Sequence, residues 1–255
     1  MAERIENFHA QKLRFPIGIA SAFGALLSSL IFSSSAADLP AANQKRTPAT
    51  RSADEALAAL MKGNERFASG RPAYPHEGAA RRASVASGQH PIATILACSD
   101  SRVPPEILLD EGIGDLFVVR VIGNIGGSDE VGSIEYGVEH LGTPLLVVLG
   151  HSQCGAVTAA VTHAEVHGNI PRLLAHIKPA VEIARRSHPE LKGSALVPEA
   201  VQANVFQSIE ELFKRSESIR QHVLDGKLKI VGAVYDIQTG RVNWLGDQAH
   251  QNALR

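Results

Sequence analysis

The chain contains only two cysteines, and each comes shortly after an apolar run that suits a buried strand. Cys98 follows the run 92–96, and His151 and Cys154 follow the run 145–149. Open α/β sheets bind their ligands at the carboxyl ends of the strands. Two strands that each end in soft metal ligands therefore predict one shared site, and zinc is the ion that best fits two thiolates and an imidazole.

The number of cysteines limits the kind of metal site. Cys98, His151 and Cys154 leave a fourth position on a tetrahedral ion, and catalytic zinc sites keep that position for water. A closed site of four cysteines, or of three cysteines and a histidine, is excluded because the chain has only two. Cys154 also lies where a helix is expected to begin, which favours its thiolate form.

Asp100 and Arg102 predict what happens at the fourth position. Asp100 is two residues beyond Cys98, so both side chains face the same side if the backbone stays extended. Its carboxylate either binds the metal directly or accepts a hydrogen bond from a metal-bound hydroxide, and Arg102 can hold it away from the metal. Water on zinc loses a proton near neutral pH and becomes a nucleophile. A structural ion pair is the alternative for these two residues.

A disulfide between Cys98 and Cys154 is the main alternative to the metal site if the protein is exported. It explains neither His151 nor the nearby Asp100 and Arg102. The matching alternative function is an exported zinc-binding or redox module without turnover.

The amino end of the sequence predicts export. Basic residues precede the uncharged run 15–32, and small residues before Asp38 suit a signal peptidase. We therefore assign residues 1–37 to a cleaved signal peptide and residues 38–52 to a linker, and we expect a periplasmic or secreted protein. An uncleaved membrane anchor is the alternative, because the run approaches the length of a membrane span. After cleavage we expect no stable association with a membrane.

The remaining residues, 53–255, predict one α/β catalytic domain. The formal net charge of −1 gives no reason to expect a nucleic acid partner. Alternation of strands and helices predicts a mostly parallel sheet of four strands, an antiparallel edge strand and helices on both faces. The predicted strands are 92–98, 116–122, 145–149, 228–235 and 241–245. The predicted helices after the first are 79–87, 106–109, 129–140, 154–167, 170–186 and 197–218.

An amphipathic helix is predicted ahead of the first strand, as an N-terminal helical arm. Ser52 and Glu55 form a capping box at its start, and Gly70 ends it. Leu60 and Met61 belong to its apolar face. Such a helix packs either on its own domain or on a partner subunit.

The segments 98–102 (CSDSR) and 151–155 (HSQCG) together resemble the β-class carbonic anhydrases. The resemblance is to exported bacterial members of the plant-like branch and covers most of residues 53–245. It implies a zinc enzyme that converts carbon dioxide reversibly to bicarbonate and a proton, by attack of zinc-bound hydroxide. It also implies one Zn²⁺ per subunit and assigns the site residues: Cys98, His151 and Cys154 as ligands, Asp100 and Arg102 as the catalytic gate, and Asp100 as a ligand in the closed state only.

The same resemblance implies a substrate pocket and a partner. Gln89, Phe117 and Tyr136 fall where the plant-like branch lines its pocket, with Tyr136 from a neighbouring subunit, and Gly155 is assigned to the same pocket. The family's basic unit is a dimer with exchanged N-terminal helices, so we expect a homodimer or a dimer of dimers. Ile95 stands where bicarbonate-regulated members carry tryptophan, so no non-catalytic bicarbonate site is expected. Hydrolysis of CS₂ or COS on the same scaffold is the rival activity.

Overall fold

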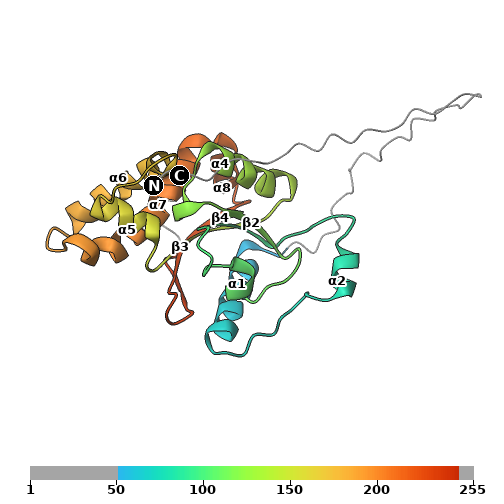
Figure 1. Cartoon of the computed structure of the whole chain (residues 1–255). Helices are drawn as coiled ribbons and strands as arrows, with labels where there is room; N and C mark the ends of the chain where they lie inside the picture. Colours follow the sequence, from blue (N-terminus) through green and yellow to red (C-terminus); the bar gives the residue numbers. More distant parts are fainter. Residues whose placement is uncertain (1–50, 247–255) are drawn as a thin grey trace, which may run out of the picture. The chain divides into compact units, whose positions relative to one another are not determined.

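The computed structural model describes residues 51–246 (Figure 1). The predicted signal peptide, most of the predicted linker and the last nine residues of the chain lie outside this range. Within residues 51–246, no helix combines the length and the apolar character that crossing a membrane requires.

A single five-stranded sheet forms the centre of the described part. Its strands are β1 (Ala93–Ala97), β2 (Leu116–Arg120), β3 (Leu145–His151), β4 (Lys229–Tyr235) and β5 (Val242–Trp244). The strand order is β2-β1-β3-β4-β5, and only β5 runs antiparallel to its neighbour. The predicted fold class is therefore confirmed. Every residue of β1 and β3 is buried, as expected for central parallel strands covered on both faces.

Helices cover both faces of this sheet. They are α1 (Ala53–Ala68), α2 (Ala79–Ser84), α3 (Pro105–Leu108), α4 (Ser128–Glu135), α5 (Gly155–Thr162), α6 (Ile170–Ser187), α7 (Val197–Arg215) and α8 (Glu217–Leu224). Short helical turns are η1 (Ile122–Asn124), η2 (Tyr136–His140, a π-helical turn that continues α4) and η3 (Gly193–Leu196). One core joins α1 and α3 to the sheet, and a second joins α4, α7 and α8 to its other face (Figure 1). A third core packs α5, α6 and α7 around Cys98 and Cys154, beyond the ends of β1 and β3.

The N-terminal helix packs on its own domain. Its predicted capping box is confirmed, because Glu55 N–H donates to Ser52 Oγ at 3.2 Å and Ser52 N–H donates to Glu55 Oε2 at 2.7 Å. The buried face differs from the prediction, since Met61 is 39% exposed. Asn64 is buried instead and hydrogen-bonds three backbone groups outside the helix. Small and polar residues make this contact because the helix approaches the backbone around Leu109 too closely for large ones.

Three predicted helices have wrong boundaries. The predicted helix 79–87 ends at Ser84. The predicted helix 154–167 ends at Thr162, because His163 takes a left-handed conformation with φ 54°. The predicted helix 197–218 is two helices, α7 and α8. Ser216 separates them with an extended backbone, and its Oγ caps α8 by accepting from Ile219 N–H at 3.1 Å.

Candidate metal centre

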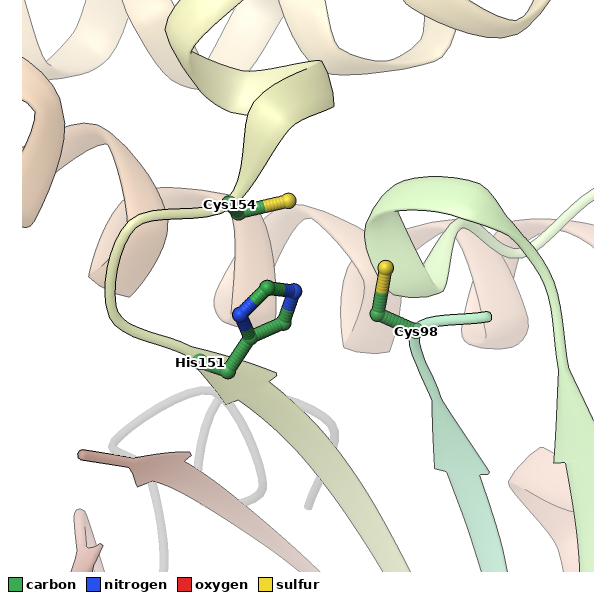
Figure 2. A group of neighbouring side chains, drawn as sticks. All are labelled: Cys98, His151 and Cys154. Atoms are coloured by element: carbon green, nitrogen blue, oxygen red, sulfur yellow. The ribbon is translucent and has the colours of Figure 1, made fainter. Parts of the chain in front are cut away.

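Parallel pairing of β1 with β3 brings the two cysteine-containing segments together. Cys98 directly follows the last residue of β1, and His151 is the last residue of the neighbouring β3. Cys154 follows a tight turn in which Gln153 has φ 56°, and it is the N-cap of α5. The three side chains point toward one another (Figure 2). Their ligand atoms lie within 4.8 Å of one another, and all three residues are buried.

His151 presents one ring nitrogen to this group. Nδ1 lies 2.9 Å from the carbonyl oxygen of Ser152, and a carbonyl only accepts, so we assign the ring proton to Nδ1. Nε2 is buried and has no hydrogen-bond partner among residues 51–246. A buried ring nitrogen is costly when nothing binds it. A histidine whose other nitrogen donates to a backbone carbonyl is the usual arrangement of a metal ligand, so this donor set fits a metal ion.

The two thiols are free, so the disulfide alternative is wrong. Hydrogen bonds from Cys154 and from the backbone N–H of Gly123 lower the pKa of Cys98 to about 4. The adjacent Cys98 sulfur and burial raise the pKa of Cys154, although the N–H groups at the start of α5 favour its anion. The start of α5 thus favours the anion of Cys154, as the sequence predicts, whereas the adjacent sulfur and burial act against it. A divalent cation would displace the remaining proton and balance both sulfurs.

Asp100 and Arg102 form a bidentate pair beside the three donors. The Arg102 side chain donates from Nε to Oδ1 at 2.9 Å and from Nη2 to Oδ2 at 2.7 Å, and its backbone N–H also donates to Oδ1. These hydrogen bonds hold the pKa of Asp100 well below its usual range. Oδ2 of Asp100 lies 3.9 Å from Nε2 of His151. The carboxylate therefore stands at the edge of the donor set as an anion that only accepts hydrogen bonds.

Three residues that the sequence analysis did not assign also hold this site. Arg120, at the end of β2, donates to the carbonyl oxygens of Cys98 and Asp100 at 3.0 and 2.6 Å. Gly123 N–H donates to Cys98 Sγ at 3.3 Å, and Asn204 Nδ2 donates to the Gly123 carbonyl at 2.8 Å. The only sequence signal for Arg120 is its position as a basic residue at the end of the predicted strand 116–122. The backbone groups of Gly123 leave no signal in the sequence.

The predicted pocket residues lie in three places. Phe117 and Tyr136 lie together, with ring centroids 6.0 Å apart. They are not beside the metal ligands of their own chain, because Phe117 stands three residues before the end of β2, or about 10 Å along the strand. Gln89 is exposed and precedes β1, at the opposite end of that strand from Cys98. Gly155 is exposed beside Cys154, with open space where a Cβ would stand.

The chain is similar in sequence and in fold to known carbonic anhydrases. Residues 93–242 match the family model described as carbonic anhydrase. A solved β-carbonic anhydrase of the fungus Aspergillus fumigatus aligns with a TM-score of 0.64 and 27% identity, over 78% of this chain and 94% of that one. The chain belongs to the β-class carbonic anhydrase family. The predicted family, and with it the prediction of an enzyme, are confirmed.

Bacterial members of the family are more similar in sequence. Carbonic anhydrase 2 of Mycobacterium tuberculosis H37Rv is 43% identical over 188 residues, which are 72% of this chain and 88% of the relative. The carbonic anhydrase of Mycolicibacterium smegmatis is 40% identical over 196 residues, 74% of this chain and 93% of the relative. The β-carbonic anhydrase similarity therefore spans nearly the whole length of these relatives and most of this chain.

Proposed function

We propose that this β-carbonic anhydrase is a zinc-dependent enzyme that converts carbon dioxide reversibly to bicarbonate and a proton. One observation carries the proposal: two sulfurs and the unpartnered Nε2 of His151 converge beside a carboxylate that Arg102 holds. Cys98, His151 and Cys154 are the proposed zinc ligands. When bound, zinc supplies a Lewis acid that lowers the pKa of a bound water to about 7.

The ligand set balances the charge of the metal. Two thiolates and a neutral imidazole sum with a divalent ion to zero, so the site does not attract a further anion by net charge. This suits a neutral substrate such as carbon dioxide and the release of a monoanionic product. Gly155 supports access, because its missing side chain leaves open space beside Cys154.

Asp100 orients the attacking water. Since Arg102 keeps the carboxyl ionised, Asp100 would accept a hydrogen bond from that water, and the proton that the water loses would pass to solvent and not to Asp100. This fixes the oxygen lone pair toward carbon dioxide. If Arg102 released Asp100, the freed carboxylate could hold the metal as a fourth protein ligand and would then close the site. We propose this exchange as the gate that the sequence predicts.

Gln89, Phe117 and Tyr136 are proposed to line the substrate pocket, with Tyr136 reaching the site of a neighbouring subunit in a homodimer or a dimer of dimers. Two facts support this: Tyr136 is 48% exposed, and Phe117 lies on β2, which is an edge strand. Solved β-carbonic anhydrases of Sordaria macrospora, 28% identical to this chain, are described as tetrameric. We also propose a periplasmic or secreted location, on the strength of the amino-terminal sequence alone.

Stopped-flow measurement of carbon dioxide hydration, combined with metal analysis, tests the proposal. The purified protein should contain one zinc per chain, lose activity with a chelator and regain it with Zn²⁺. Cys98→Ser should lose both metal and activity, whereas Ser99→Ala, at an exposed neighbour, should keep both. Absence of zinc-dependent hydration between pH 7 and 9 would contradict the proposal. Turnover of CS₂ or COS with negligible hydration of carbon dioxide would favour the rival activity.

A further inference from the structure

A chain of hydrogen bonds ties the proposed metal ligand Cys98 to a distant helix. Gly123 N–H donates to Cys98 Sγ at 3.3 Å. The carbonyl oxygen of the same Gly123 accepts from Asn204 Nδ2 at 2.8 Å. Asn204 lies on α7, 81 residues further along the chain. One glycine therefore connects α7 to the sulfur through its two backbone groups.

The turn that carries Gly123 has an unusual backbone conformation. Gly123 has φ 74° and the next residue, Asn124, has φ 44°, so two successive residues take the left-handed conformation. Glycine and asparagine are the residue types that adopt this conformation most readily, so the turn is local, and outside contacts decide where its carbonyl and N–H groups point. A Cβ at Gly123 would come within 2.7 Å of Ile177 Cδ1 on α6, so a side chain cannot replace the glycine without displacing that helix contact.

Asn204 is placed to make such a contact. It is 1% exposed and lies among the buried residues of α7, which include Val201 and Val205. A buried amide costs free energy unless it is hydrogen-bonded. Its Oδ1 has no partner within residues 51–246, so the bond to Gly123 is the side-chain bond that justifies a polar residue there. An apolar residue would suit this helix face better if packing were its only role.

We propose that Asn204 is a positioning residue for the metal. By holding the Gly123 carbonyl, it keeps the Gly123 N–H on Cys98 Sγ, which fixes the direction of the sulfur lone pairs and partly offsets the thiolate charge. Outer partners of this kind typically change metal affinity by 10- to 100-fold. The inference rests on the proposed zinc function, but it concerns retention of the metal and not the hydration reaction.

The rate of zinc loss from the purified holoenzyme to a chromogenic chelator tests the inference. Asn204→Ala should lose zinc about 10-fold faster than the wild type or more. Ser208→Ala is the matched control: its hydroxyl lies one turn along α7, is 2% exposed and bonds only the backbone carbonyl of Asn204. The rate at which Ser208→Ala loses zinc should stay within about twofold of the wild-type rate. If Asn204→Ala and Ser208→Ala lost zinc at equal rates, whether slow or fast, the inference would be overturned.

A second measurement needs no variant, in case Asn204→Ala does not fold. In wild-type protein loaded with ¹¹³Cd and labelled with ¹⁵N, NMR should detect scalar coupling between the metal and the Gly123 amide proton through Cys98. Absence of that coupling, with coupling to the Cys98 side-chain protons present, would overturn the inference alone. A wild-type protein that binds neither zinc nor cadmium would overturn the proposed function, and the inference with it.

Discussion

Both carboxylate oxygens of Asp100 accept hydrogen bonds from the guanidinium of Arg102, at 2.9 and 2.7 Å. The contact is bidentate, and Arg102 is 47% exposed at the side chain while Asp100 is 17% exposed. The arginine therefore holds the carboxylate from the solvent side, while Oδ2 stays 3.9 Å from Nε2 of His151. A side chain so placed can control whether Asp100 accepts a hydrogen bond from water or binds the metal.

Asp100→Asn should reduce kcat/KM for carbon dioxide hydration by about 100-fold, because an amide cannot serve as an acceptor on both terminal atoms. Zinc content should stay unchanged, since the three ligands remain. Stopped-flow kinetics and metal analysis of the same sample check this. Loss of zinc together with activity would assign Asp100 to metal binding and contradict the orienting role.

Arg102→Ala should shift the pH profile of activity upward. Removing the guanidinium frees the Asp100 carboxylate to compete with water for the fourth position on the metal. Hydroxide would win that competition only at a higher pH than in the wild type. Arg102→Lys keeps the positive charge without the bidentate fork and should restore activity only partly. An unchanged profile in Arg102→Ala would argue against the gate.

Glu111 should make stability depend on pH. Burial, followed by the charge of Asp115, raises its pKa to about 7 from 4.5. The folded protein therefore binds this proton more tightly than the unfolded chain, and the stability that Glu111 contributes is lost as pH rises from about 4.5 through about 7. After a discount for its partial exposure to solvent, the loss is on the order of 1 kcal/mol.

Urea unfolding at pH 5 and pH 8.5 checks this dependence. The free energy of unfolding of Glu111→Gln should rise relative to the wild type between the two pH values. The exposed Glu106, on the preceding turn, provides the control, and Glu106→Gln should show no such change. If the free energies of unfolding of Glu111→Gln and the wild type differed by the same amount at both pH values, the raised pKa of Glu111 would be contradicted.

Asn64→Ala should destabilise the protein by about 2–4 kcal/mol, because it leaves buried backbone groups without partners. Asn64 Nδ2 donates to the carbonyls of Leu108 and Gly240, and its Oδ1 accepts from Val242 N–H. Lys62→Ala, on the exposed side of α1, should change stability by less than about 0.5 kcal/mol. Similar effects in thermal unfolding of the two variants would show that Asn64 does not anchor the helix.

Mixed dimers test whether Tyr136 serves a neighbouring subunit. One sample pairs a Cys98→Ala chain with a Tyr136→Ala chain, and the other pairs a Cys98→Ala/Tyr136→Ala chain with the wild type. If Tyr136 acts across subunits, the first sample contains one complete site and the second contains none. The first should therefore be the more active after purification through two different tags. The opposite ranking would place Tyr136 in the site of its own chain.

The sheet could be predicted because its strands are apolar runs bounded by turn residues, and the capping box of Ser52 and Glu55 is local in sequence. The break between α7 and α8 was missed for a tertiary reason. Ser216 caps α8 and also donates to Glu135 Oε1 at 2.6 Å, 81 residues earlier in the chain. No local pattern reveals that contact.

The metal donors were predictable because few residue types bind zinc, and the spacing of His151 and Cys154 is short. Asn204 was not, because it acts through the backbone of Gly123, and Arg120 leaves only a weak signal as a basic residue at the end of a strand, because it acts through the backbone of Cys98. Such roles depend on which strand and helix lie beside β1. They become visible only when the chain is folded.

A crystal structure at pH 8, with an anomalous difference map at the zinc absorption edge, tests the central claim most directly. We expect one zinc ion bound by Cys98, His151 and Cys154, with Zn–S distances of about 2.3 Å and Zn–N of about 2.0–2.1 Å. A solvent oxygen should complete the coordination, with Asp100 still on Arg102. A disulfide between the cysteines, no zinc peak between them, or a fourth protein ligand at this pH would contradict the account.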